Sequence, residues 1–271
     1  MSKRTNRSLK RIIANISLHK LKEISIAFRV FQNPVPQILL YLGITRFSSP
    51  YIVNLRNGYK IQIDSPDDLV SVWGCWIRQD YPVYGDEKVI IDAGANIGAF
   101  SLFAASKSRN AQILAIEPVT NTFEKLNQNI RASTSDKRIN CAKYGIASNS
   151  GEQTIYLGSA GTYSSFYENQ TNQTEIVITK TLHQVFQEIG NDQEIDLLKM
   201  DCEGAEMDSL LGAAASTLGR CKRIVMEYHT FAGFNINDVT QHLGDAGFSN
   251  TKLEHFQGLN CGLAYYVRNL L

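Results

Sequence analysis

The stretch KVIIDAGANIGAFSLF, residues 88–103, contains three local patterns in succession. A short apolar run begins at Val89 and ends at Asp92, which is typical of a central parallel strand covered on both faces. A glycine turn follows between Gly94 and Gly98, and the apolar positions beyond it have the spacing of a helix. Strand, glycine turn and helix in this order predict the nucleotide-binding corner of a doubly wound α/β domain.

The spacing of this turn distinguishes two classes of cofactor. A dinucleotide-binding turn has the pattern G-x-G-x-x-G, because the pyrophosphate approaches bare backbone at a helix N-terminus. Counted from Gly94, this chain has Asn96 and Ala99 where that pattern needs its second and third glycines. S-adenosylmethionine has no phosphate and carries a sulfonium cation, so the acidic strand end at Asp92 suits it better. The spacing D-x-G-x-N-x-G resembles the first motif of class I S-adenosylmethionine-dependent methyltransferases. The alternative is a glycine turn with a helix-capping asparagine.

A carboxylate in register with this motif supports the same interpretation. The apolar run ILAI ends at Glu117, about 25 residues after Asp92, close to the spacing expected for a carboxylate that binds ribose hydroxyls. A surface glutamate before a proline is the alternative. A third strand is predicted over 139–144, and in class I folds the loop after it touches the adenine. We therefore predict cofactor contacts at Asp92, Gly94, Ala95, Asn96, Gly98, Glu117, Pro118, Ile146 and Ala147.

The second chemical stretch is IDLLKMDCEGAE, residues 195–206. Its apolar start predicts a buried strand, and Asp201, Glu203 and Glu206 crowd the carboxyl end, where open α/β sheets bind ligands. Lys199 shares a strand face with Asp201, so it is expected to pair with an acid. Three carboxylates could serve as base, sulfonium partner or metal ligands. The alternative is that such acids favour the first turn of a helix predicted over 205–218.

A further strand, predicted over 223–228, ends in polar groups that include His229. Because histidine titrates near neutral pH, it can take a proton from a hydroxyl, although a lone histidine is more often a surface or hydrogen-bonding residue. Strands four and five are adjacent in the class I sheet, so Asp201 and His229 are predicted to face one pocket, with Asp201 orienting His229 or each acting alone. One of these two residues is the expected base. The predicted catalytic residues are thus Asp201, His229 and Glu203, with no metal.

Composition describes an ordinary globular protein. Of 271 residues, 20% are charged and 44% are hydrophobic, which suits one large α/β domain with an appendage. The five cysteines form no C-x-x-C pair, which argues against a disulfide framework or a zinc site and fits a reducing compartment such as the cytoplasm. No apolar run approaches the ~18 residues of a membrane span.

Charge is distributed unevenly along the chain. Residues 1–22 contain seven Lys or Arg and no acid, so the remaining 20 basic and 26 acidic residues have a net charge of −6. Polar residues interrupt the apolar positions near the N-terminus, which argues against an export signal. Instead, residues 12–31 have helical spacing. We weigh two interpretations of residues 1–32, a peripheral contact with the anionic inner membrane face or a protein, and a helix packed on its own domain.

The remaining segments complete the predicted architecture. Alternation around Asn57-Gly58 predicts a hairpin with a type I′ turn over 51–63. The aromatic segment 73–84 either lines the pocket or caps the sheet edge. Antiparallel pairs are expected at 152–157 with 175–179, and at 248–253 with 263–268. The predicted parts are a basic helical extension (1–48), a hairpin and aromatic cap (49–87), and a cofactor-binding domain (88–271).

Together, IIDAGANIGAFSLFAA with AIEP, and IDLLKMDCEGAEMDSLLGA followed by RIVMEYH, resemble the FkbM family of methyltransferases. The resemblance covers roughly residues 89–229. It implies a Rossmann-like class I fold with a seven-stranded, mostly parallel sheet, and O-methylation that often targets a sugar or polyketide hydroxyl. Thr181-Leu182-His183 departs from the Thr-Leu-Asp associated with this region, which puts any role of that acid in doubt.

We therefore predict an S-adenosylmethionine-dependent O-methyltransferase that acts on a sugar, glycan or other small natural product. One alternative is a methyltransferase that acts on nucleic acid. The net acidic catalytic part argues against it, as does the absence of an Asn/Asp-Pro-Pro-aromatic tetrapeptide. Another alternative is a non-catalytic subunit that retains the cofactor only for structure, and the retained acids argue against that.

Overall fold

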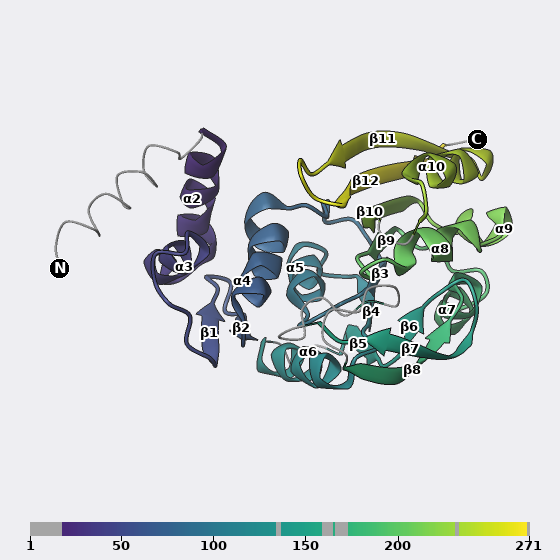
Figure 1. The fold of residues 1–271 in the computed structure, drawn as a ribbon. Helices are drawn as coiled ribbons and strands as arrows, with labels where there is room; N and C mark the ends of the chain where they lie inside the picture. The colour runs from purple at the N-terminus through teal and green to yellow at the C-terminus, as the bar shows by residue number, and fades with distance from the viewer. Residues whose placement is uncertain (1–17, 134–136, 159–164, 166–172, 231–232, 270–271) are drawn as a thin grey trace.

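The computed structural model describes residues 18–133, 137–158, 165, 173–230 and 233–269. Its largest sheet has seven strands in the order β11-β12-β10-β9-β3-β4-β5 (Figure 1). Neighbouring strands are parallel except at β12, which lies antiparallel to both β10 and β11. The predicted seven-stranded, mostly parallel sheet with a C-terminal antiparallel strand is thus confirmed. The strands are β3 (Val89–Ala93), β4 (Gln112–Ile116), β5 (Ile139–Ala142), β9 (Leu197–Met200), β10 (Arg223–His229), β11 (Phe248–His255) and β12 (Cys261–Arg268).

Helices cover both faces of this sheet. Because successive residues of a strand point to opposite faces, Ile90 lies in one hydrophobic cluster and Ile91 in the other. Phe103 of α5 and Leu126 of α6 pack in the first cluster, whereas Phe186 of α7 packs in the second. This is the predicted doubly wound arrangement. The covering helices are α5 (Ala99–Lys107) and α6 (Thr120–Ser133) on one face, and α7 (Leu182–Ile189), α8 (Ala205–Leu211), α9 (Ala215–Leu218) and α10 (Ile236–Asp245) on the other.

The helix predicted over 205–218 is wrong as a single element, since α8 and α9 are separate helices. Gly212 ends α8 and packs directly against Ser148, where a Cβ atom would come within 2.7 Å of the serine Cβ. The Ser148 amide also donates to Asp208 Oδ2 at 3.0 Å. The interruption therefore follows from contact with a distant loop, which helical periodicity does not report.

A smaller sheet of three strands lies beside the large one, in the order β6-β8-β7 (Figure 1). The predicted antiparallel pair is confirmed by β7 (Gly151–Tyr156) and β8 (Thr174–Lys180). The short strand β6 (Gly145–Ile146) runs parallel to β8. Because β6 carries Ile146, this sheet fixes one wall of the cavity described below.

The N-terminal part contains α2 (Leu18–Val30), α3 (Pro34–Tyr41) and a hairpin of β1 (Tyr51–Asn54) and β2 (Lys60–Ile63). The hairpin is confirmed, but the predicted type I′ turn is wrong. Among the described residues with positive φ, Gly58 is the only one from this turn, whereas a type I′ turn needs two. The Gly58 amide donates to Leu55 O at 3.0 Å, and the Tyr59 amide donates to Asn57 Oδ1 at 3.1 Å. The loop is thus a three-residue connection that ends in a left-handed glycine.

Helix α2 packs on the rest of the chain through Ala27, while Phe31 just beyond its end is equally buried. Leu21 and Phe28, two members of the predicted apolar stripe, are instead about half exposed. No described helix combines the length and the apolar character needed to cross a bilayer. A membrane or protein contact through residues 1–32 stays a prediction, and residues 1–17 lie outside the described part of the chain.

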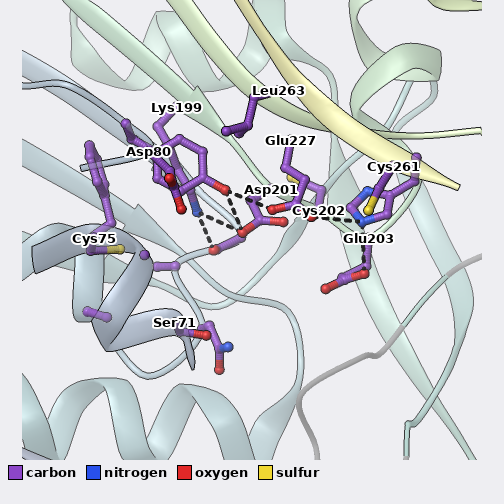
Figure 2. Close-up of a pocket in the computed structure, with 18 of the residues that line it drawn as sticks. Ser71, Cys75, Asp80, Lys199, Asp201, Cys202, Glu203, Glu227, Cys261 and Leu263 are labelled. Carbon is purple, nitrogen blue, oxygen red and sulfur yellow. Dashed lines mark hydrogen bonds and ion pairs between the residues drawn. The ribbon is translucent and has the colours of Figure 1, made fainter. Parts of the chain in front are cut away.

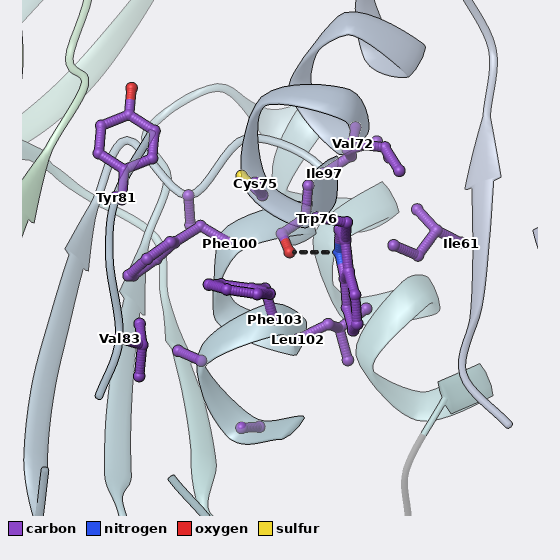
Figure 3. Close-up of a cluster of buried hydrophobic side chains, with 14 of the residues drawn as sticks. Ile61, Val72, Cys75, Trp76, Tyr81, Val83, Ile97, Phe100, Leu102 and Phe103 are labelled. Atoms are coloured by element: carbon purple, nitrogen blue, oxygen red, sulfur yellow. Dashed lines mark hydrogen bonds between the residues drawn. The ribbon is translucent and has the colours of Figure 1, made fainter. Parts of the chain in front are cut away.

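The aromatic segment reaches the cavity only in part, and its two tryptophans pack in the core rather than at a sheet edge. Trp73, at the end of α4 (Pro66–Trp73), is a buried core residue. Trp76, on the π-helical turn η1 (Gly74–Arg78), is also buried, and Figure 3 shows it in a cluster of hydrophobic side chains. Trp76 packs edge-on against Phe103 and donates from Nε1 to Ala99 O at 3.1 Å, so it ties this segment to the start of α5. Tyr81 instead reaches the cavity.

Candidate active site

A cavity of about 820 Å³ opens at the carboxyl ends of β3, β4, β9 and β10 (Figure 2). One half is bounded by the turn after β3 and by Glu117. The other half is bounded by the α4–η1 segment and the β11–β12 hairpin, with Arg78, Asp80, Phe256 and Tyr265 among its walls. Parallel sheets of this topology bind ligands at this edge. The turn after β3 and the β11–β12 hairpin thus line one continuous space.

The turn after β3 is held in place by its backbone. Gly94, Asn96 and Gly98 all have positive φ, and the amides of Gly94 and Ala95 both donate to Ile116 O. A Cβ atom on Gly94 would lie 1.8 Å from the carbonyl oxygen of Asp201. The glycine is therefore required by close contact between the turn and the end of β9 as well as by its backbone conformation.

Glu117 lies at the end of β4 with its carboxylate turned toward this turn. Its oxygens accept hydrogen bonds from the amides of Asn96 at 3.1 Å and Val119 at 3.0 Å. Burial outweighs these bonds and raises the pKa of Glu117 to about 7. The side chain lines the cavity, where remaining lone pairs can accept hydrogen bonds from a bound hydroxyl.

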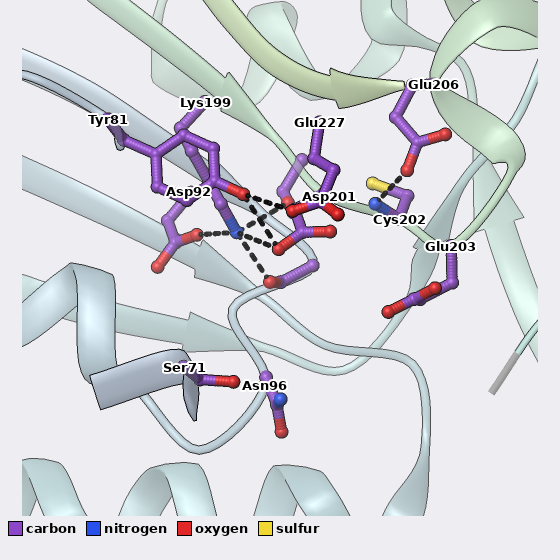
Figure 4. A network of polar contacts seen from close by, with 12 residues as sticks. Ser71, Tyr81, Asp92, Asn96, Lys199, Asp201, Cys202, Glu203, Glu206 and Glu227 are labelled. Carbon is purple, nitrogen blue, oxygen red and sulfur yellow. Dashed lines mark hydrogen bonds and ion pairs between the residues drawn. The ribbon is translucent and has the colours of Figure 1, made fainter. Parts of the chain in front are cut away.

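Asp92 does not reach the cavity, contrary to the predicted cofactor contact. Its buried carboxylate forms an ion pair with Lys199 at 3.0 Å and accepts a hydrogen bond from Ser101 at 2.6 Å (Figure 4). Lys199 Nζ also donates to Gly94 O at 2.8 Å. The predicted pairing of Lys199 with an acid is confirmed. Asp92 fixes the position of Lys199, and Lys199 in turn stabilises the turn through its hydrogen bond to Gly94.

Two other predicted contacts also lie behind the cavity wall. Gly98 caps α5 and faces Leu126 and Ile130, and Ala147 is buried next to β6 without lining the space. Six of the predicted residues do line the cavity, namely Gly94, Ala95, Asn96, Glu117, Pro118 and Ile146.

The predicted catalytic residues meet at the ends of β9 and β10. Asp201, Glu203 and His229 all line the cavity, so the structure brings them together as the strand order implied. Neither Tyr81 nor Glu227 was predicted as a catalytic residue, although the segment 73–84 was expected as one alternative to line the pocket, and both belong to the same group (Figure 4). The Tyr81 hydroxyl oxygen lies 3.0 Å from Asp201 and 3.4 Å from Glu227, and it can donate its one proton to either carboxylate. Alternation along β10, which puts Glu227 on the same face as His229, was the available signal for Glu227.

His229 is oriented by Glu206 rather than by Asp201, which corrects the prediction. Its Nδ1 lies 3.3 Å from Glu206 and its Nε2 lies 3.3 Å from Glu203. Glu206 is fully buried and also accepts from the amides of Cys202 and Gly204, so it does not line the cavity. These bonds fix the Glu206 carboxylate in position behind the imidazole.

The charge state of His229 follows from these neighbours. Burial alone would lower its pKa, but the carboxylates of Glu206, Glu203 and Asp201 together raise it to about 10. The imidazole is therefore a cation at neutral pH and has no lone pair with which to accept a proton. The predicted role of His229 as the base is wrong on this geometry.

Two groups of side chains bring potential metal ligands within 4.8 Å of one another, Asp201–Glu203–His229 and Glu227–His229–Cys261. Both groups would need a lone pair from His229, whose two nitrogens already face carboxylates. We assign no metal ion here, and the absence of a metal stays a prediction.

Residues 92–249, more than half of the chain, match the methyltransferase FkbM domain. The chain belongs to this family. The FkbM match ends before β12 and begins after Tyr81, so the chain completes the cavity with segments on both sides of the matched domain.

Several relatives of this FkbM chain are methyltransferases by name. Methyltransferase 1 of Beauveria bassiana is 31% identical over 172 residues, which cover 56% of this chain and 68% of the relative. The hexuronic acid methyltransferase AglP of Haloferax volcanii is 27% identical over 173 residues, with coverages of 62% and 67%. The AMB antimetabolite synthetase AmbE of Pseudomonas aeruginosa is 31% identical, but this chain spans only 9% of its length.

A solved structure, the methyltransferase FkbM from Methylobacillus flagellatus, aligns with a TM-score of 0.48 and 14% identity over 94% of this chain and 60% of that one.

Proposed function

We propose that this FkbM methyltransferase uses S-adenosylmethionine to methylate a hydroxyl of a sugar, glycan or other small natural product. The observation that supports this most directly is the single cavity that joins Glu117 to the carboxylates at the ends of β9 and β10. A carboxylate suited to ribose hydroxyls and a polar group suited to a hydroxyl acceptor thus open onto one space. The relative that acts on a hexuronic acid supports a sugar as the acceptor class.

The residues of the cofactor half fit S-adenosylmethionine. Within the described part of the chain, Asn96 Oδ1 is buried without a hydrogen-bond partner although its residue lines the cavity. A ligand that brings an ammonium or hydroxyl donor would satisfy this oxygen. Glu117 would accept the ribose hydroxyls, and Ile146 offers an apolar wall for the adenine. When bound, S-adenosylmethionine supplies an electrophilic methyl group on a sulfonium.

The main contribution of the protein to methyl transfer is to align the acceptor hydroxyl with the methyl group. The turn at Gly94 and the end of β9 touch each other, so groups on either side are held at a fixed separation. Fixing an acceptor oxygen in line with a methyl group removes most of the entropy cost of bringing two molecules together. Asp201, Glu203 and Glu227 give the acceptor hydroxyl hydrogen-bond acceptors that orient its lone pair toward the methyl group.

Transfer of an isotopically labelled methyl group tests this function. The protein is incubated with methyl-labelled S-adenosylmethionine and a panel of neutral glycosides, uronate glycosides and polyhydroxylated natural products, and products are identified by mass. We expect one labelled methyl ether on a hydroxyl acceptor. Calorimetry with S-adenosylmethionine and NAD is run in parallel. Tighter binding of NAD would overturn the proposal, as would label found only as a methyl ester.

A further inference from the structure

The carboxylates that line the cavity differ in their hydrogen-bond donors and ion-pair partners. Asp201 accepts the Tyr81 hydroxyl at 3.0 Å and lies 4.0 Å from the Lys199 ammonium. Glu203 lies 3.3 Å from Nε2 of the His229 cation. A hydrogen bond or an ion pair within 3.3 Å thus engages each of these two carboxylates, and burial together with the charge of Asp201 raises the pKa of Glu203 well above its usual range.

Glu227 is the exception among these three. Its nearest cationic atom, His229 Nε2, is 3.9 Å away, and its bond from the Tyr81 hydroxyl is the longer of the two at 3.4 Å. About a quarter of its side chain is exposed to the cavity, so it can exchange a proton with a bound hydroxyl and then with water.

Glu227 and Asp201 also differ in where they lie along the cavity. Asp201 follows β9, and its carbonyl touches the turn that bounds the cofactor half. Glu227 lies one strand further away on β10, where it pairs with Leu263 of β12. The β11–β12 hairpin bounds the other half of the cavity, so Glu227 faces the space left for the acceptor.

We propose that Glu227 is the catalytic base, and that His229 remains a cation which holds Glu203 and Glu206 in place without exchanging a proton. This assignment rests on the proposed function. As the acceptor oxygen bonds to the methyl carbon, the carbon–sulfur bond breaks and its electron pair stays on sulfur. The hydroxyl proton moves to the Glu227 carboxylate, which becomes a carboxylic acid and later returns the proton to water.

The ionisation of Glu227 agrees with this role. Burial and the charge of Asp201 raise its pKa to about 7, whereas a base is most effective when its pKa lies near the working pH. The titratable groups that face this carboxylate from neighbouring elements are Tyr81, Asp201, Glu203, His229 and Cys261.

The charge of His229 can be measured without any reaction. In the full chain with 13C-labelled histidine, the His229 resonance is identified from its loss in His229→Gln and followed from pH 5 to 11 by NMR. We expect the imidazolium signal to persist through pH 8 and to titrate near pH 10. Glu206→Gln removes the fixed charge and should move this midpoint down by at least one pH unit. An imidazole that is neutral at pH 7 in the wild type would overturn the assignment.

The base is identified by comparing Glu227→Gln with Glu203→Gln. Using the acceptor found in the labelling experiment, Glu227→Gln should lower single-turnover methyl transfer by about 10²–10⁴ while S-adenosylmethionine affinity, measured by calorimetry, changes less than about twofold. The rise in rate through pH 7 should disappear in this variant and persist in Glu203→Gln. Glu227→Asp, which keeps a carboxylate, should recover part of the rate.

Wild-type transfer with no loss in Glu227→Gln would overturn Glu227 as the base. If Glu227→Gln fails to fold, as judged by melting, Glu227→Asp is compared with Glu203→Asp, and a rate lowered equally in both, or in neither, would overturn Glu227 as the base. If the wild type transfers no methyl group to any acceptor, the proposed function and Glu227 as base fall together. The NMR measurement still tests the His229 cation.

Discussion

Among the glycines of the described residues, Gly94 is the position that leaves the least room for an added Cβ atom. Its φ is positive, and an added Cβ would lie 1.8 Å from the carbonyl oxygen of Asp201, just after β9. Gly58 also has a positive φ, but nothing lies within 4 Å of the position its Cβ would take. Alanine substitutions at the two glycines therefore separate the free-energy cost of a left-handed backbone from the cost of a steric clash.

Gly94→Ala should lower the free energy of unfolding by about 2–5 kcal/mol, of which ~1–3 comes from overpacking and ~1–2 from the left-handed conformation. Gly58→Ala carries only the conformational cost and is the matched control. Denaturant unfolding measures both, and calorimetry should show loss of S-adenosylmethionine binding for Gly94→Ala alone. Equal stability losses in the two variants would mean that the turn and β9 are not in contact.

Glu117 connects the first motif to the cavity, because it accepts the Asn96 amide and still faces open space. Glu117→Gln should weaken S-adenosylmethionine binding by roughly 1.5–3 kcal/mol, the usual size for hydrogen bonds to a charged group. Calorimetry measures the change. Glu152→Gln, an exposed substitution on β7, is the control, and a similar loss there would point to a general effect of charge.

The raised pKa of Glu117 also predicts how binding depends on pH. A carboxylate is needed to accept both ribose hydroxyls, yet the free protein binds a proton there below about pH 7. S-adenosylmethionine affinity should therefore rise with pH through this value, by up to tenfold per unit on the acidic side. Calorimetry in buffers of different ionisation enthalpy should detect proton release on binding at pH 6. Uptake of a proton instead would contradict the assignment.

Functional residues could be predicted from the sequence where their roles depend on neighbours along the chain. They could not be predicted where those roles depend on partners that only folding brings close. Glu117 follows a strand at a characteristic spacing, so it was found. Asp92 was assigned to the cofactor because its partner, Lys199, comes from a distant strand that neutralises it. Tyr81 gave no signal beyond its aromatic neighbours, since its hydroxyl meets Asp201 only after the chain has folded.

Among the elements, α2 is more integrated than its basic sequence suggests. Glu23 is buried and accepts a hydrogen bond from Trp73 Nε1 at 2.7 Å. Phe31 packs against the same tryptophan, with ring centroids 5.9 Å apart. Of the two interpretations of residues 1–32 that the sequence left open, these contacts favour a helix packed on its own domain. Strands and hairpins were predicted well because alternation is local, whereas the attachment of α2 is tertiary.

Removing α2 should therefore destabilise the protein. A chain that starts at Asn33 loses the contacts to Trp73, so its melting temperature should fall and its tryptophan emission should shift to longer wavelength. A chain that starts at Leu18 keeps these contacts and is the matched control. Unchanged melting of the shorter chain would restore the view that α2 is a separate appendage. Vesicle flotation of the full chain, compared with the chain that starts at Leu18, tests the predicted membrane contact.

At the scale of the whole molecule, one hydrophobic cluster runs from the N-terminal part into the central sheet. It joins Ile61 of the hairpin, Trp76 of η1 and Phe103 of α5 to Ile90 of β3. Apolar surface shared in this way is lost from both parts if either one unfolds alone. The segment 49–87 is therefore expected to unfold together with residues 88–271, although the sequence separates them by pattern.

The positions of the tryptophans make this testable. The chain has two, Trp73 and Trp76, and both lie in the segment 49–87, so fluorescence reports on that segment while far-ultraviolet circular dichroism reports on all helices and strands. Thermal or denaturant transitions followed by the two signals should coincide. Phe186→Ala, on the opposite face of the sheet, should lower the free energy of unfolding by ~3–5 kcal/mol and shift both transitions equally. A fluorescence transition that stays in place while the circular dichroism transition moves would show that the aromatic segment folds independently.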